Sequence, residues 1–324
     1  AVHRGLEALR DGTCDTVVAG GVNLLLTPSL FISFDRAGML SPDGHCKSFD
    51  SAANGYARGE GAGVVILKRL SDAVADGDPI HAVIRGSGVN HGGRANSLTA
   101  PNPNAQARLL VDTYRRAGVS ASEVSYIEAH GTGTRLGDPI EVNGLKKAFA
   151  ELAQEQGTPN RERACAVGSV KSNIGHLETA AGIAGLLKVV LALKHQSIPK
   201  TVHYKEQNPH IDLAGSPFFV ADEHHHWKRG EGPEGEQPRI AGVSSFGFGG
   251  TNAHVVLEEY VGVEGGAEGT NSPEGQAFIV PLSARDETAL VALAQRLSDA
   301  LDRDPLLRLQ DLAHTLQRGR QALR

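Results

Sequence analysis

The chain has 324 residues, of which 40% are apolar and 21% charged, and its formal net charge at pH 7 is −5. This composition indicates a soluble globular protein of one large domain or two ordinary ones, and excludes a disordered or fibrous chain. A small negative charge provides no basic face for nucleic acid, and no apolar run reaches the roughly 18 residues of a membrane span. We therefore expect no nucleic-acid partner and no membrane partner.

Three scattered cysteines, Cys14, Cys46 and Cys165, form no CxxC pair. They are too few for a disulfide framework, which favours a reducing compartment and a cytoplasmic location.

The first residues have the pattern of a helix end, with Val2, Leu6 and Leu9 on one face and Gly12 as a stop. Because no capping residue precedes them, we expect the chain to begin inside an element, as a fragment would. A buried strand is expected at 16–23, a surface excursion at 27–58, and then strand 61–70, helix 70–75, strand 80–89 and helix 104–117.

From residue 124 onward strands and helices alternate: strand 124–129, helix 139–151, strand 166–170, helix 179–195, and strands near 237–244 and 253–259. This order predicts a layered α/β fold whose functional loops leave the strand ends. Residues 261–276 are rich in Gly, Glu, Ser and Pro, as linkers are. Beyond them, residues 278–284 and helices 286–301 and 309–318 are expected to form a small α/β unit.

Two loops carry the candidate chemistry. His130 lies in HGTGTRLGDP (130–139) and His176 in SVKSNIGHLE (169–178), with Lys171 between them and the glycine-rich SSFGFGGTNAH (244–254) further on. Separated histidines, a lysine and a loop of flexible backbone can stabilise an oxyanion and move protons. Each histidine alone is as well explained by a role in capping a helix, so the argument depends on finding them together.

EAHGTGT, VKSNIGHLE and GFGGTNAHVVLEE resemble the motifs of β-ketoacyl synthases, the thiolase-fold condensing enzymes, and specifically the ketosynthase domains of modular polyketide synthases. The resemblance covers residues 1 to about 259. The segment 92–106 further resembles ketosynthases served by a separate acyltransferase. Residues 278–324 resemble the front of the linker domain that follows such ketosynthases.

The resemblance implies a layered α/β/α/β/α thiolase-like fold, represented here by its C-terminal portion. It divides the chain into a ketosynthase portion at 1–260, a linker at 261–277 and a partial associated domain at 278–324. It also implies polyketide chain elongation by decarboxylative Claisen condensation of a malonyl extender on an acyl carrier protein. A homodimer is the expected assembly.

Family roles fall on particular residues. The imidazoles of His130 and His176 would stabilise the enolate, and Lys171 would orient His130 and bias its charge. The backbone N–H of Phe248 would serve a second oxyanion hole. Positions that hold the carrier's phosphopantetheine arm, or form a gating loop, are Thr132, Thr134, Phe246, Gly247, Gly249 and Gly250. No cofactor or metal is expected to bind directly, and a solvated loop explains His224, His225 and His226 better than a metal site does.

In this family the nucleophile is a cysteine at a helix start, in a motif that ends with AVH. The matching cysteine would therefore lie upstream of Ala1, and structural roles suit Cys14, Cys46 and Cys165. Two other functions stay open: a non-elongating ketosynthase that only transfers acyl groups, and a structural or docking half without activity. A thiolase is disfavoured because residues 246–252 contain no second catalytic cysteine.

Overall fold

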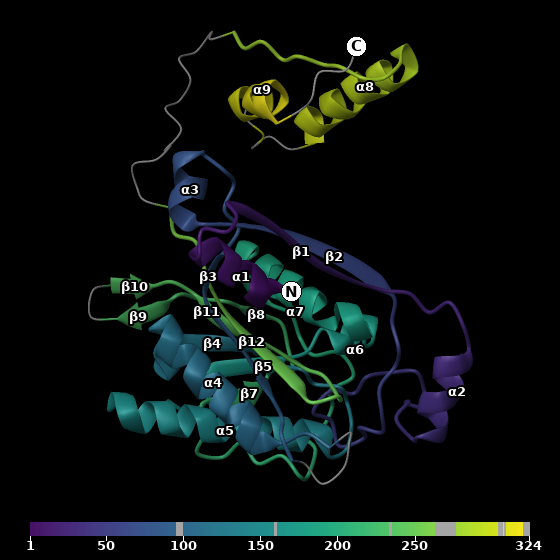
Figure 1. The fold of residues 1–324 in the computed structure, drawn as a ribbon, viewed down its shortest axis with the longest axis vertical. Coiled ribbons are helices and arrows are strands. Elements are labelled where there is room, and N and C mark those ends of the chain that lie inside the picture. Colours follow the sequence, from purple (N-terminus) through teal and green to yellow (C-terminus); the bar gives the residue numbers. More distant parts are fainter. Residues whose placement is uncertain are drawn as a thin grey trace. The chain divides into compact units, whose positions relative to one another are not determined.

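The computed structural model describes residues 1–94, 100–158, 161–232, 235–262, 277–303, 307 and 309–319 (Figure 1). The chain divides into two compact units, residues 1–261 and 262–324. Each unit is described separately below. In the described residues, no helix is long and apolar enough to cross a membrane.

A mixed six-stranded sheet organises the first unit. Its strand order is β3-β12-β11-β4-β5-β7, in which β12 is antiparallel to both neighbours and β11, β4, β5 and β7 run parallel. The strands are β3 (Val83–His91), β4 (Val124–Glu128), β5 (Cys165–Gly168), β7 (Phe218–Val220), β11 (Ile240–Phe246) and β12 (Thr251–Glu258). The parallel strands end at one edge of the sheet, which is where functional loops gather in α/β folds.

Helices cover both faces of this sheet (Figure 1). One face packs against α4 (Pro103–Ala117) and α5 (Gly137–Gln156), with Tyr114, Phe149 and Phe218 in the core between them. The opposite face packs against α7 (Ala181–Lys194), whose residues Leu186 and Val189 join Tyr126 and Val243 in a second core. The sequence of α7 is apolar on nearly every side, as is typical of a helix buried between two layers.

The layer beyond α7 is a ribbon of β1 (Thr16–Asn23) and β2 (Gly61–Lys68), paired antiparallel along their full length. Its inner face approaches α7 closely, since a Cβ on Gly63 would lie 2.8 Å from Leu187 Cδ1. Helix α1 (Val2–Arg10) packs on β1, and a Cβ on Gly5 would clash with Val17 at 2.6 Å. The described layers are thus α/β/α/β.

The outer face of the ribbon is apolar and exposed. Val18, Val22, Val64 and Ile66 are 56–73% exposed in an alternating pattern, while the residues between them face inward. We expected residues 16–23 to form a buried strand. They form a strand with two apolar faces, but the described residues cover only its inner face, so the expectation of burial was wrong for the outer face.

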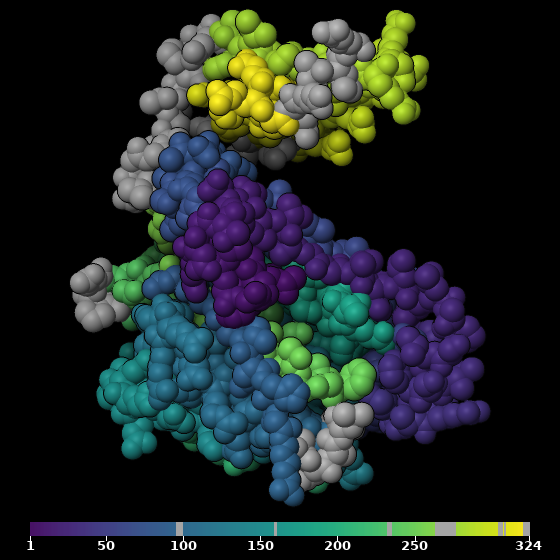
Figure 2. All heavy atoms as spheres, viewed as in Figure 1, coloured from purple at the N-terminus to yellow at the C-terminus, as the bar shows by residue number. Residues whose placement is uncertain are grey.

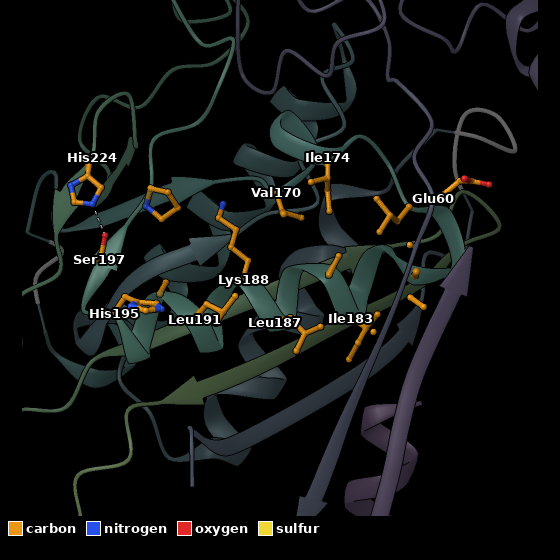
Figure 3. Close-up of a pocket in the computed structure, with 18 residues that line it drawn as sticks. Glu60, Val170, Ile174, Ile183, Leu187, Lys188, Leu191, His195, Ser197 and His224 are labelled. Carbon is orange, nitrogen blue, oxygen red and sulfur yellow. Dashed lines mark hydrogen bonds between the residues drawn. The ribbon is translucent and has the colours of Figure 1, made fainter. Parts of the chain in front are cut away.

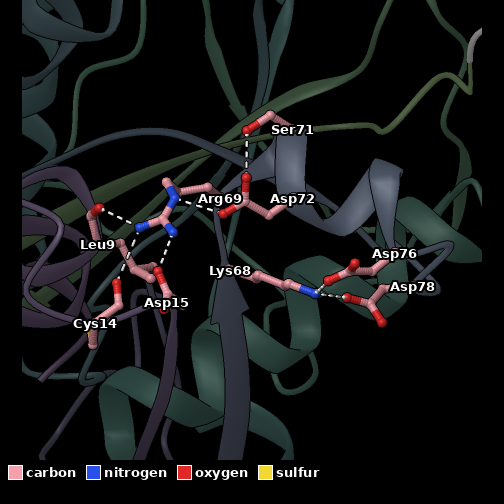
Figure 4. Close-up of polar contacts among 9 residues, drawn as sticks. All are labelled: Leu9, Cys14, Asp15, Lys68, Arg69, Ser71, Asp72, Asp76 and Asp78. Carbon is pink, nitrogen blue, oxygen red and sulfur yellow. Dashed lines mark hydrogen bonds and ion pairs between the residues drawn. The ribbon is translucent and has the colours of Figure 1, made fainter.

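A network around Arg69 joins α1, β1 and the short helix α3 (Leu70–Ala75) (Figure 4). The Arg69 guanidinium donates to the carbonyls of Leu9 at 3.0 Å and Cys14 at 3.1 Å, to the Asp72 carboxylate at 2.7 Å, and to Asp15. The network fixes the turn that connects α1 to the ribbon.

The remaining elements of the first unit are short. They are α2 (Ser29–Arg36), α6 (Lys171–Ile174), the 3-10 turns η1 (Ala121–Glu123) and η2 (Glu178–Ala180), and the strand pairs β6 (Ser197–Ile198) with β8 (His225–His226) and β9 (Gly230–Gly232) with β10 (Gly235–Gln237). The expectation of an irregular excursion at 27–58 missed α2. His225 and His226 lie in a strand, whereas a solvated loop was expected.

The second unit contains α8 (Glu287–Arg303) and α9 (Leu309–Arg318) in its described residues. Gln317 Nε2 donates to the Ile279 carbonyl at 2.6 Å, which ties the segment before α8 to α9. Residues 277–284 have no regular secondary structure and pair with no strand in the part of this unit that is described. The expected α/β character of this unit is therefore not observed there: its regular elements are helices.

Candidate active site

Three adjacent parallel strands carry the candidate residues to one edge of the sheet. His130 follows β4, Phe246 ends β11, and Lys171 and His176 follow β5. Since β11 pairs with β4 and β4 with β5, residues up to 116 positions apart converge at this edge.

The two imidazoles face each other. The ring centroids of His130 and His176 are 5.4 Å apart with an interplanar angle of 83°. The structure thus brings the two sequence-predicted histidines together in an edge-to-face arrangement, and both residues are largely buried without being fully enclosed.

Backbone N–H groups define which nitrogen of each ring is free. The N–H of Glu178 donates to Nδ1 of His176 at 2.9 Å, and the N–H of Phe246 donates to Nδ1 of His130 at 3.3 Å. A neutral imidazole whose Nδ1 accepts a hydrogen bond carries its proton on Nε2. Both histidines therefore present an Nε2–H donor.

Their surroundings keep both rings neutral. Burial, and then the charge of Lys171, lowers the pKa of His176 to about 3. Burial, Lys171 and His176 together lower the pKa of His130 well below its usual range. Two neutral imidazoles that each donate an N–H are suited to stabilising a negative charge as it develops.

Lys171 lies at the start of α6 and is 3% exposed. Burial lowers the pKa of its ammonium, while the acidic groups nearby, Glu128 first and then Glu141, oppose that shift. Its charge acts on both imidazoles. The sequence interpretation connected Lys171 to His130 alone.

Two buried carboxylates shape the loop around His130, and the sequence interpretation missed the role of Glu141. Its carboxylate accepts the backbone N–H groups of His130 at 2.7 Å and Gly131 at 2.8 Å, and burial raises its pKa to about 7. Asp138 accepts the N–H of Phe49 at 2.8 Å and of Gly133 at 3.2 Å, and burial raises its pKa to about 6. Asp138 thus holds the loop through two backbone N–H groups.

The hydroxyls of Thr132 and Thr134 are 3.2 Å apart on this loop. Gly133, between them, has a φ of +77°, and a Cβ there would lie 2.7 Å from Lys47 N. Only glycine fits this close approach without strain.

The glycine-rich loop at 247–250 connects β11 to β12 and lies on the surface (Figure 2). Phe246 is 8% exposed with its ring 5.8 Å from that of His130, whereas Phe248 is 60% exposed. The N–H of Gly250 donates to the Gly247 carbonyl at 2.8 Å, which closes a tight turn. The structure therefore joins Phe246 to the histidines directly and leaves the Phe248 side chain in solvent.

A cavity of about 720 Å³ lies beside the site, between α7 and the start of β2 (Figure 3). Apolar side chains line most of it, among them Ile174, Leu177, Ile183 and Leu187. Ile174 and Leu177 belong to the loop that carries His176, but neither histidine of the pair lines the cavity itself.

Two of the three cysteines lie in surroundings that disfavour the nucleophilic thiolate. Cys46 and Cys165 are buried, and burial raises the pKa of both thiols. Cys46 Sγ also accepts the N–H of Ala57 at 3.2 Å, while Cys14 is half-buried in the turn after α1. A catalytic thiolate requires a lowered pKa, and neither Cys46 nor Cys165 meets that requirement.

Comparison with known proteins identifies the family. The models described as Beta-ketoacyl synthase, N-terminal domain, Beta-ketoacyl synthase, C-terminal domain, and Ketoacyl-synthetase C-terminal extension match residues 1–73, 81–205 and 208–324. The chain belongs to the β-ketoacyl synthase family.

The chain is also similar to parts of curated polyketide synthases. The chain is 49% identical over 328 residues to polyketide synthase PksN of Bacillus subtilis, covering 100% of this chain and 6% of PksN. It is 48% identical over 308 residues to polyketide synthase ThaG of Burkholderia thailandensis, covering 94% of this chain and 5% of ThaG.

Solved ketosynthases have the same fold. The ketosynthase from module 6 of the bacillaene synthase of Bacillus subtilis is 43% identical with a TM-score of 0.88, covering 99% of this chain and 54% of that structure. The oxazolomycin ketosynthase domain OzmH KS7 of Streptomyces albus is 40% identical with a TM-score of 0.89, covering 99% of this chain and 54% of that structure. The predicted polyketide-synthase ketosynthase family and thiolase-like fold are confirmed. The chain spans about half of these ketosynthase structures and a small part of the synthases.

Proposed function

We propose that this chain is the C-terminal portion of an elongating ketosynthase, which extends an acyl chain by decarboxylative Claisen condensation. The observation that supports the proposal most directly is the pair of neutral imidazoles, His130 and His176, whose Nε2–H groups donate to no residue in the described part of the chain. Two such donors on one thioester oxygen stabilise an enolate.

The proposed reaction has two steps, decarboxylation and condensation. A malonyl thioester on an acyl carrier protein loses carbon dioxide, and the electron pair of the broken C–C bond becomes the enolate. The enolate carbon attacks the carbonyl of an acyl chain held on a cysteine. A new C–C bond forms, the cysteine thiolate leaves, and the β-ketoacyl chain remains on the carrier.

The nucleophilic cysteine in this proposal comes from a segment upstream of these residues, at a helix N-terminus that favours the thiolate. The buried, high-pKa surroundings of Cys46 and Cys165 support that assignment. The backbone N–H of Phe248 would join that of the cysteine in a second oxyanion hole for the acyl carbonyl.

Other residues would bind the carrier's arm and control the charge. Thr132 and Thr134 would hold phosphopantetheine, and the loop of Phe246, Gly247, Gly249 and Gly250 would gate access. Lys171 would keep both imidazoles neutral rather than act as a nucleophile, because its positive charge raises the cost of protonating either ring. Acyl carrier proteins are the proposed partners, in a cytoplasmic homodimer.

We divide the chain into a ketosynthase portion at 1–260, a linker at 261–277 and a partial associated domain at 278–324. The similarity to PksN and to the module 6 bacillaene ketosynthase supports a place in a modular polyketide synthase, of the kind served by a separate acyltransferase. Part of the segment that suggested this kind, residues 95–99, lies outside the described residues.

Mass spectrometry of the carrier protein tests the proposal. The complete ketosynthase domain is loaded with a short acyl group and given malonyl carrier protein in one assay, and carrier protein with a free phosphopantetheine thiol in a second. We expect the carrier to gain the acyl group plus two carbons, with loss of carbon dioxide. Acyl transfer to carrier without extension would instead identify a non-elongating ketosynthase, and an inert domain a structural role.

A further inference from the structure

We propose that Arg58 is a positioning residue for His176, acting through Glu178, whose backbone N–H defines the tautomer of the imidazole. The catalytic consequence rests on the proposed function, but the tautomer itself does not.

Arg58 and Glu178 form a bidentate pair across 120 positions of sequence. Arg58 Nε donates to Glu178 Oε1 at 2.5 Å and Nη2 donates to Oε2 at 2.9 Å. The Arg58 side chain is 2% exposed, so the pair is shielded from water on the arginine side. Two parallel bonds restrict a carboxylate in orientation as well as in distance.

Aromatic rings hold the guanidinium in place. The Arg58 Cζ atom lies 4.5 Å from the ring centroid of Phe31 and 5.3 Å from that of Phe34, both on α2. Stacking of this kind favours arginine over lysine. Arg58 is thus restricted both by its carboxylate partner and by the face of α2.

Glu178 adopts a backbone conformation that needs such support. Its φ is +42°, a region that a residue with a side chain seldom occupies without compensation. In this conformation its N–H is directed to Nδ1 of His176, at 2.9 Å. The side-chain pair with Arg58 therefore stabilises the conformation that makes the tautomer-defining bond.

The backbone around Arg58 also holds His176. The N–H of His176 donates to the Ala57 carbonyl at 2.7 Å, and the N–H of Gly59 donates to the His176 carbonyl at 2.9 Å. Residues 57–59 consequently hold the main chain of His176 while the Arg58 side chain orients the next turn. An ion pair with only a structural role would not need to contact His176 both through the backbone of residues 57–59 and through Glu178.

Nitrogen-15 NMR of the full chain, labelled at histidine and without substrate, reads the tautomer of His176. Its signal is assigned by its loss in His176→Asn. We expect the Nε2–H tautomer in the unmodified chain, and a mixture with the Nδ1–H tautomer in Arg58→Lys and in Glu178→Gln. Exchange of the Glu178 amide hydrogen should become at least about tenfold faster in Arg58→Lys, since its local structure is weakened.

Arg229→Lys is the matched control. Arg229 makes the same kind of bidentate pair with Glu259: Nε donates to Oε2 at 3.0 Å and Nη2 donates to Oε1 at 3.1 Å. Glu259 directly follows the last residue of β12. The control variant should leave the His176 signal unchanged. The Nδ1–H tautomer in the unmodified chain, an unchanged signal in Glu178→Gln, or an equal change in Arg229→Lys would each overturn the proposal.

In the complete ketosynthase, Arg58→Lys should lower kcat for malonyl decarboxylation by about 10- to 100-fold with little change in KM, as expected when a catalytic group is displaced by about an ångström. Because the tautomer is read without substrate, a domain that never decarboxylates malonyl carrier would contradict the proposed function and leave the tautomer result standing.

Discussion

Each of the two site histidines is oriented through its Nδ1 atom, which accepts a backbone N–H. The backbone N–H of Phe246 donates to Nδ1 of His130, and that of Glu178 donates to Nδ1 of His176. No side-chain base is therefore needed to select the tautomer. Burial favours the uncharged rings, and Lys171 adds to that effect. This combination suits stabilisation of an anion better than removal of a proton.

The cysteine environments give a prediction at the same scale. Incubating the 324-residue chain with an acyl-N-acetylcysteamine thioester should label no cysteine, because burial raises the pKa of Cys46 and Cys165 and leaves little thiolate. Intact-protein mass spectrometry followed by peptide mapping provides the measurement. Stoichiometric acylation of Cys14, Cys46 or Cys165 would show that the nucleophile is in this chain.

Glu141 gives a second prediction. In Glu141→Gln, one of the N–H groups of His130 and Gly131 would face an amide N–H₂ in place of an oxygen. We expect unfolding to need about 1–3 kcal/mol less, the usual cost of an unsatisfied buried donor. Denaturant unfolding measures it, with the exposed Glu151→Gln as control. Equal losses in both variants would mean that the Glu141 bonds do not stabilise the loop.

Among the elements, β11, β12 and α4 meet at a fully buried histidine, His254. His254 Nδ1 lies 3.0 Å from Ser244 Oγ, and Nε2 lies 3.2 Å from the Tyr114 hydroxyl. Gly242 makes room for the ring, since a Cβ there would lie 2.7 Å from His254 Cε1. The contact joins two strands of the sheet to the helix that covers them.

Burial lowers the pKa of His254 to about 3, which makes its contribution to stability depend on pH. Unfolded chains bind a proton at this residue below its ordinary pKa of about 6.5, and the folded chain does so only near 3. The contribution of His254 to the free energy of unfolding is therefore fully present above about pH 6.5. It falls by up to about 1.4 kcal/mol per pH unit as the pH drops toward 3.

Unfolding of the chain and of His254→Gln, compared at several pH values between 4 and 7, checks this effect. We expect the stability difference between the two to shrink as the pH falls. A difference that stays constant over this range would show that His254 is not held neutral by burial.

Periodicity predicted most of the regular elements, and motif resemblance predicted which residues gather at the site. Helices α4 and α7 and strands β1, β3 and β4 lie within a few residues of their expected positions, because their apolar patterns are long. Helix α2 was missed, since its eight residues have no buried side chain to produce a pattern.

Contacts between distant segments could not be found this way. The bond from Phe246 N–H to His130 and the pair of Arg58 with Glu178 join residues 116 and 120 positions apart. The sequence does show that Glu141 is a carboxylate in the helix that follows His130. Its two bonds from the backbone N–H groups of His130 and Gly131, however, depend on the turn at Gly131. Only the folded chain reveals these relationships.

On the scale of the whole molecule, the ribbon of β1 and β2 has a contiguous apolar face that is exposed in the described part of the first unit. Val64 is 60% exposed and Ile66 73% exposed on one face. Surfaces of this kind mark interaction sites or cause aggregation. We therefore expect the 324-residue chain to associate reversibly through this face when it is studied alone.

Sedimentation velocity over a range of concentrations measures the association. The double variant Val64→Thr with Ile66→Thr keeps β-branched residues in the strand but reduces the apolar area, so it should shift the chain toward monomer. Leu136→Thr, which changes a residue 64% exposed outside the ribbon, is the control. A monomeric unmodified chain, or equal association in both variants, would contradict the prediction.

The central claim is that His130 and His176 act together on the enolate and not on the acyl-cysteine. It is tested most directly by malonyl decarboxylation in the complete ketosynthase domain, measured beside cysteine acylation in the same preparations. His130→Ala and His176→Ala should each lower the decarboxylation rate by about 10²–10³, the usual cost of losing one oxyanion donor, and leave acylation largely intact. Either variant decarboxylating malonyl carrier at the normal rate, or losing acylation to the same extent as decarboxylation, would contradict the account.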